Sequence, residues 1–275
     1  MENYKINYRT NKKINLGQYE GGEMEKTQEK KVLSIITEIY IFVILIIFPL
    51  CVDSTGFFRI LECKYRCYLI INSIYLISII VTLLYYFLFK KTRFFKGLKL
   101  HKLQWIVIVF WIANVISTLA SPFFNKYNLF VGVGRGEGLI NITLYCLNFL
   151  CITLFGEFKK RYIIYFSISS IFVSLISILQ YIGFNPFNMY QDGIGTHNVS
   201  FIGTIGNVDT VSALYCIFLT VSMASFVFLE ESKHYKIMHL ISIYMGFFIF
   251  EVLDVLSRNS SFWSNISISA SFYYY

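Results

Sequence analysis

The chain has 275 residues, of which 56% are hydrophobic and only 15% are charged, whereas a soluble domain usually carries about a quarter charged residues. This composition excludes an ordinary soluble globular enzyme. The net charge of +8 does not indicate a nucleic-acid partner, because the basic residues lie in short clusters between apolar runs, which is how membrane orientation is encoded.

The first 31 residues form a polar segment with seven basic and five acidic residues and no apolar run. Such a segment buries too little apolar surface to offset its ordering entropy, so we predict a disordered cytoplasmic tail over residues 1–31. A signal peptide is excluded, because it would place a short apolar region near the start and a small-residue cleavage site after it.

Residues 32–256 consist mainly of long apolar runs, and runs of about 18 or more residues predict transmembrane helices. They lack the alternation of barrel strands, so we predict an all-α bundle with seven spans. Residues 257–275 are expected to form an outer-face tail or an incomplete eighth helix. The expected spans are Val32–Val52, Tyr68–Phe89, Leu103–Leu119, Leu139–Phe155, Tyr162–Ile182, Val211–Leu229 and Ile237–Leu256.

The basic residues outside these spans are unevenly divided between the two sides. Eighteen Lys and Arg fall on the side of the N-terminal tail and six on the other side. Because cytoplasmic segments carry the excess of basic residues, the N-terminus is expected in the cytoplasm of a multi-pass protein of the cell membrane.

Cys63 and Cys67 are four residues apart in one expected outer loop. They are able to pair or to bind a metal, but there is no second such pair and no nearby His. The sequence therefore favours two unpaired thiols, and no metal site is expected.

The first unusual outer segment surrounds Arg135 and Glu137 with glycines at positions 132, 134, 136 and 138. Glycine permits close approach to a ligand, and an Arg beside a helix N-terminus suits a phosphate or diphosphate. A flexible loop in which Arg135 and Glu137 pair is the alternative, and both interpretations stay open. No strand precedes the glycines, which excludes a dinucleotide-binding loop.

Two further outer segments carry polar residues. The loop Gly183–Thr210 contains His197, a possible general base or a solvated side chain, and ends with Asn207 and Asp209, which suit either a sugar hydroxyl or a helix cap. Near the end of the last span, Glu251, Asp254 and Arg258 share one helical face. Carboxylates inside a membrane mark function or pair with a cation, and both explanations stay open for these residues.

The order of these elements resembles the O-antigen ligase and polymerase superfamily of bacterial membrane glycosyltransferases. The similarity lies in the Arg–x–Glu–Gly segment at Arg135–Gly138, the Gly–Thr–x–Gly–Asn segment at Gly203–Asn207, and the pair Ser257 and Arg258, and it covers roughly residues 30 to 265.

This resemblance implies that a glycan is taken from a polyprenyl-diphosphate carrier and joined to an acceptor sugar at the outer face during surface-polysaccharide assembly. It implies no cofactor, nucleotide sugar or metal. Arg135 and Arg258 are the positions that match the diphosphate-binding arginines. Glu137, Asn207 and Asp209 complete the expected set of substrate-binding residues, and no catalytic residue is identified.

Two departures from the family pattern change these expectations. Asp209 stands where the family usually has a second Asn, and family members continue into further helices and an outer loop with a functional His that has no counterpart before Tyr275. The resemblance therefore leaves open whether the chain is an enzyme, and we expect a truncated form without transfer activity. The alternative function is that of a non-catalytic membrane protein, either transporter-like or lipid- or glycan-binding.

Overall fold

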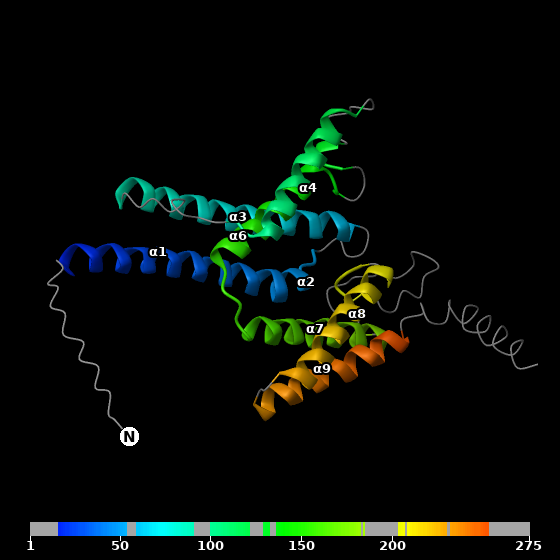
Figure 1. Ribbon diagram of the computed structural model, residues 1–275. Coiled ribbons are helices and arrows are strands. Elements are labelled where there is room, and N and C mark those ends of the chain that lie inside the picture. Colours follow the sequence, from blue (N-terminus) through cyan, green and yellow to red (C-terminus); the bar gives the residue numbers. More distant parts are fainter. Residues whose placement is uncertain are drawn as a thin grey trace, which may run out of the picture.

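The computed structural model describes the backbone of residues 16–53, 59–90, 100–121, 129–132, 136–182, 184, 203–206, 208–229 and 232–252. Side chains are described from residue 28 onward within these ranges, except at positions 181, 208, 209, 251 and 252. All regular secondary structure in this part of the chain is helical (Figure 1).

The first span is a rod of three consecutive helical segments. They are α1 (Leu16–Phe42), a π-helical turn η1 (Val43–Ile47) and the short α2 (Phe48–Leu50). Pro49 in α2 has no backbone N–H and cannot continue the usual hydrogen-bond ladder, and a wider turn precedes it. Helix α1 starts well before the expected span at Val32, because the apolar run nucleates a helix that extends back through good helix formers such as Glu, Lys and Gln.

Five more long helices and one shorter one follow the first span. They are α3 (Ile60–Phe89), α4 (Lys102–Leu119), α6 (Leu139–Phe155), α7 (Arg161–Tyr181), α8 (Val208–Phe228) and α9 (Lys233–Val252). The 30 residues of α3 extend about 45 Å at helical rise. This exceeds the roughly 30 Å of a hydrocarbon core, so α3 either tilts in the bilayer or extends beyond its hydrocarbon core.

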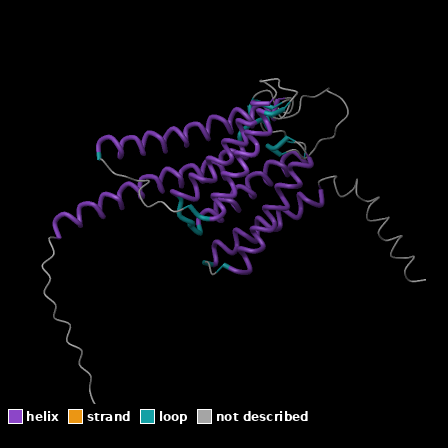
Figure 2. Tube along the Cα trace, turned by 45° about the horizontal axis from the view of Figure 1, so that its top comes forward, coloured by secondary structure: helices purple, strands orange, loops and turns teal. Residues whose placement is uncertain are grey.

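The helices run alternately up and down. In Figure 1, α2 and the starts of α3 and α8 lie toward the right, whereas the starts of α1, α7 and α9 lie toward the left. We call the end of the molecule that holds the end of α2, the starts of α3, α6 and α8 and the end of α7 the motif end. Figure 2 shows the same arrangement in a turned view, with the helices side by side and connecting loops at the two ends of the bundle.

Five helices in the described part of the chain are long and apolar enough to cross a membrane. Much of their outer surface is apolar and exposed, including Phe87 at 63%, Ile106 at 62% and Val227 at 65% exposure. Apolar surface of this extent, on helices long enough to cross a bilayer, indicates contact with lipid. The protein is therefore a multi-pass helical membrane protein. Its candidate spans are Gln28–Leu50, Ile60–Phe89, Lys102–Leu119, Arg161–Gln180 and Thr210–Phe228.

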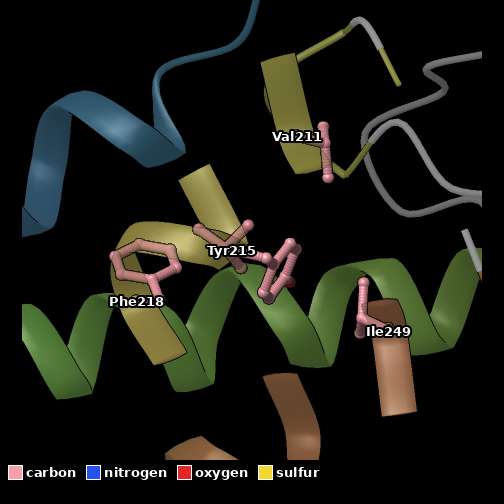
Figure 3. Close-up of a cluster of buried hydrophobic side chains, with 5 residues drawn as sticks. Val211, Tyr215, Phe218 and Ile249 are labelled. Carbon is pink, nitrogen blue, oxygen red and sulfur yellow. The ribbon is translucent and has the colours of Figure 1, made fainter. Parts of the chain in front are cut away.

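Helices α7, α8 and α9 pack on one another around a buried cluster of Val173, Val211, Tyr215, Phe218 and Ile249. Figure 3 shows Tyr215 and Phe218 of α8 lying over α7, with Ile249 approaching from α9. The two ring centroids are 5.9 Å apart at an angle of 76°, an edge-to-face arrangement that stabilises aromatic pairs.

A second buried cluster joins α1, α3 and α6 through hydrogen-bonded polar groups. Asn72 of α3 accepts a 2.8 Å hydrogen bond from the Tyr40 hydroxyl of α1, and it also accepts one from the amide of Asn148 on α6. The rings of Tyr40 and Tyr75 stack with centroids 4.1 Å apart. Because hydrophobic association is weak within lipid, such hydrogen bonds and close contacts supply much of the helix association.

Candidate functional site

Two glycine turns contact the first two turns of α3. In the turn before α6, Gly136 has a φ of 68°, and a Cβ atom there would lie 2.7 Å from Cδ2 of Tyr65. In the turn before α8, Gly206 has a φ of 90°, and a Cβ atom there would overlap the side chain of Ile60. Both residues adopt a left-handed conformation with no room for a side chain, so glycine is required at each. Two segments distant in sequence are therefore held against one helix end.

The turn before α6 is folded back on itself. The amide of Gly138 donates a 3.2 Å hydrogen bond to the carbonyl of Val131, and Nδ2 of Asn141 donates one of 2.5 Å to the carbonyl of Gly136. Helix α6 then begins at Leu139, where the sequence predicted it. These bonds fix the described residues on both sides of positions 133–135.

The carbonyl of Pro49 at the end of α2 accepts hydrogen bonds from two other segments. Nζ of Lys64 on α3 donates to it at 2.8 Å, and the hydroxyl of Thr204 donates to it at 2.5 Å. Lys64 also donates to the carbonyl of Phe48 at 3.1 Å. A cation at the last carbonyls of a helical segment is favourable, because these carbonyls have no partner within the helix. Lys64 therefore ties the first span to α3.

Two buried amide oxygens lie at this same end. Oδ1 of Asn141, in the first turn of α6, has no hydrogen-bond partner among the described residues, and the same holds for Oε1 of Gln180 near the end of α7. The two side chains are 4% and 3% exposed, and Nε2 of Gln180 donates a 3.0 Å bond to the carbonyl of Gly203. Buried acceptors are almost always paired, so these two mark positions for a hydroxyl or N–H donor from water or a ligand.

The described charges around the start of α3 have both signs. Arg66 and Asp53 lie 3.6 Å apart, with side chains 60% and 31% exposed, and Glu137 is also exposed. A surface pair of this kind contributes little stability and leaves both groups accessible. An anionic ligand at this end would therefore meet Arg66, a cation that is not deeply buried.

The described residues include only part of the predicted binding set. Glu137 is exposed in the turn before α6, and Asp209 lies in the first turn of α8, where the backbone alone is described. Arg135, Asn207 and Arg258 lie outside the described residues. The structure thus holds the turn that contains Glu137 and the turn that precedes Asp209 against the start of α3, and the binding roles of the five residues stay predictions. The other polar residues noted in the sequence, His197 and Asp254, also lie outside the described residues, and Glu251 is described only as backbone.

A fully buried histidine, His239 on α9, was missed by the sequence analysis. Its Nδ1 atom lies 2.8 Å from the hydroxyl oxygen of Ser167 on α7. Ser222 of α8 lies 3.3 Å from Ser167 and 2.9 Å from Ser242 of α9, measured between hydroxyl oxygens. An ionisable residue inside an apolar run is itself a signal for function or for a polar partner in the membrane. That signal was present in the sequence around position 239.

An apolar groove of about 250 Å³ lies between α1 and α3. Its walls come from Ile36, Ile39, Val43, Ile71 and Ile74, with Tyr40, Tyr75 and Ser78 completing the lining. From this groove, α1 leads through η1 to Pro49 and α3 leads back to Lys64, so both walls continue to the motif end. Its chemistry suits a hydrocarbon chain.

No family model matches the chain, no curated protein is similar to it, and no solved structure matches it.

Proposed function

We propose that the chain is an O-antigen ligase- or polymerase-like protein of a bacterial cell membrane, which holds a polyprenyl-diphosphate-linked glycan at the outer face. In this proposal the N-terminus is cytoplasmic, seven helices cross the bilayer, and the motif end faces outward. The charge asymmetry of the sequence supports this orientation.

The observation that carries the proposal is the contact of both glycine turns with the start of α3. The turn containing Gly136 and the turn containing Gly206 belong to two of the three segments on which the family resemblance rests. Contact of both with one helix end supports a common site. The oxygens of Asn141 and Gln180, which have no partner among the described residues, supply acceptors there for the hydroxyl groups of a sugar.

Each chemical part of the proposed ligand has a candidate partner in this chain. The diphosphate carries negative charge, for which Arg135 and Arg258 are the predicted partners, and neutralisation by cations is what makes a diphosphate a competent leaving group. The hydrocarbon tail matches the groove between α1 and α3, whose walls are mostly isoleucine and valine. A single amphiphile would thus contact both regions.

A non-catalytic, transporter-like protein is the second candidate. The buried cluster of His239, Ser167, Ser222 and Ser242 favours it, because polar and ionisable residues inside a membrane bundle often line the path of an ion or a proton. Against it, the sequence shows no internal repeat of the kind common in transporters. We therefore rank the carrier-lipid function first.

The test is binding of a polyprenyl diphosphate to the purified protein in lipid nanodiscs. Arg135→Ala should leave membrane insertion unchanged and weaken binding by about 1.5–3 kcal/mol, the scale of a hydrogen bond to a charged group. Arg135→Lys should recover only part of the loss, because an ammonium group lacks the planar two-point contact.

Glu137→Ala is the matched control for the interpretation in which Arg135 and Glu137 only pair with each other. Equal misfolding of the two alanine variants would favour that structural pair. Absence of carrier binding by the parent protein, or uptake of a small solute into proteoliposomes, would favour the transporter-like function.

A further inference from the structure

Three cysteine side chains gather beside Lys64 at the motif end. Cys51 follows α2 directly, and its amide donates a 3.1 Å hydrogen bond to the carbonyl of Phe48. Cys63 and Cys67 lie in the first two turns of α3. The side chain of Cys67 is within hydrogen-bonding contact of both Cys51 and Cys63, and all three thiols are free in this structure. The sequence pattern singles out only Cys63 and Cys67, because Cys51 lies in a separate segment.

Helix geometry argues against a bond between the two cysteines of α3, and of these two only Cys67 is in hydrogen-bonding contact with Cys51. Cys63 and Cys67 are four residues apart in one helix, where Cβ atoms are about 5–6 Å apart. A disulfide requires roughly 3.5–4.5 Å between Cβ atoms, so this pair would distort the helix. Cys51 belongs to a different segment and approaches Cys67 from outside α3. The hydrogen bonds from Lys64 to Phe48 and Pro49 hold that segment in place.

A metal site is a poorer explanation for this cluster. Within the described part of the chain, no three His, Cys, Asp or Glu side chains are arranged to hold a metal ion. A structural zinc site needs four ligands, most often Cys and His. Two thiols in mutual contact are instead the arrangement from which a disulfide forms.

We propose that Cys51 and Cys67 form a disulfide bond that joins the end of the first span to the beginning of α3. The proposal rests on the outward orientation of this end, because disulfides persist in the oxidising environment outside the cytoplasm. The oxidant is the disulfide of an extracytoplasmic dithiol oxidase. Closure of this bond fixes the start of α3, against which both glycine turns lie.

The exchange proceeds in two balanced steps. The thiolate of Cys67 attacks one sulfur of the oxidase disulfide, which forms a mixed disulfide and releases one oxidase thiolate. The thiolate of Cys51 then attacks the Cys67 sulfur, which closes the bond and releases the second oxidase thiolate. The two protons lost by the cysteines end on the oxidase thiols, so the chain loses two electrons and the oxidase gains two. Both Cys51 and Cys67 are partly exposed, as this requires.

The second step should depend strongly on pH. Burial, and after it the contact with Cys67, raises the pKa of the Cys51 thiol to about 11. Burial of Cys51 persists in the mixed disulfide, and only the thiolate attacks, so the rate of closure should rise with pH.

The test uses the full chain and the tryptic map of this region. Cleavage after Arg59, Lys64 and Arg66 places the three cysteines on separate peptides. Membranes from growing cells are quenched with acid, free thiols are alkylated, and linked peptides are identified by mass spectrometry without reduction. We expect a Cys51–Cys67 link in the parent and in Cys63→Ser, and no link in Cys51→Ser or Cys67→Ser.

A second experiment tests whether the two thiols are able to bond at all, independently of how the chain is oriented in the membrane. Purified reduced protein is treated with oxidised glutathione at pH 7 and pH 8, and formation of the link is followed in time. Absence of the Cys51–Cys67 link in this reaction, or a Cys63–Cys67 link in its place, would overturn the proposal. A link that forms with glutathione but not in cells would overturn the oxidation step in the cell while leaving carrier binding unaffected.

Discussion

Gly206 lies directly against Ile60, the first residue of α3, with no space for even a methyl group between them. Ile60 is only 3% exposed, and Gly206 has a φ of 90°. The contact therefore combines a conformation that favours glycine with a tight fit. It fixes the distance between the turn before α8 and the beginning of α3, which are separated by most of the chain.

We predict that Gly206→Ala destabilises the protein through both effects. The left-handed backbone should cost about 1–3 kcal/mol for a residue with a side chain, and overlap with Ile60 should add about 1–3 kcal/mol. Ile60→Ala should relieve the overlap but not the backbone strain. A double-mutant cycle measured by thermal unfolding in detergent should thus show a coupling of 1 kcal/mol or so between the two sites. Strict additivity would show that the two residues are not in contact.

The orientation of the chain is testable at described positions. On a background without cysteines, Ser121→Cys at the motif end should react with an impermeant maleimide in intact cells. Glu157→Cys, in the turn between α6 and α7, should react only after the membrane is opened, because that turn carries Lys159, Lys160 and Arg161. The reverse labelling pattern would place the N-terminus outside.

The ion pairs of Glu38 should stabilise the junction of α1 with the turn before α7. Nζ of Lys159 lies 2.7 Å from Glu38, and Arg161 contacts its other carboxylate oxygen. Lys159→Ala should lower the free energy of unfolding by about 1 kcal/mol, or about 2–4 °C in Tm for a chain of this size. Lys160→Ala is the control, because its side chain is exposed in the same turn. Equal effects of the two substitutions would mean that the net charge of the turn, and not the ion pair with Glu38, determines the free energy of unfolding.

The hydroxyl of Ser222 should contribute to packing of the last three helices. It bridges Ser167 and Ser242 inside the bundle, whereas Thr220 on an exposed face of α8 bonds only to its own helix at Cys216. Ser222→Ala should cost about 0.6–1.7 kcal/mol, the range for interhelical hydrogen bonds in membranes. Thr220→Val removes a hydroxyl without breaking such a bond and should cost much less in the same unfolding assay. A similar loss in both variants would contradict the bridging role.

The positions of several helices followed from local sequence, whereas the pairing of distant side chains did not. Helix α6 covers the expected residues Leu139–Phe155, because a glycine borders the apolar run at each end. The start of α1 at Leu16 was not expected, because residues 1–31 are polar. The helix of the neighbouring span extends into this segment in spite of its polarity.

The candidate site was predictable only in part for the same reason. The glycines around Arg135 indicated close approach to a ligand, whereas Gly206 was noted only as part of the family resemblance. Their shared partner, the start of α3, depends on three-dimensional packing between segments that no local pattern specifies. The proximity of Cys51 to Lys64 could not be predicted either, because Cys51 lies in a separate segment before α3.

The serine-rich face of α7 has a consequence for synthesis of the protein. Ser167, Ser170, Ser174 and Ser177 are all fully buried, and the helices that cover them, α8 and α9, are made later by the ribosome. A newly made α7 would expose these hydroxyls to lipid until its two partners emerge. The last three helices should therefore leave the insertion machinery together, and a chain stopped after Tyr181 should be held there or degraded.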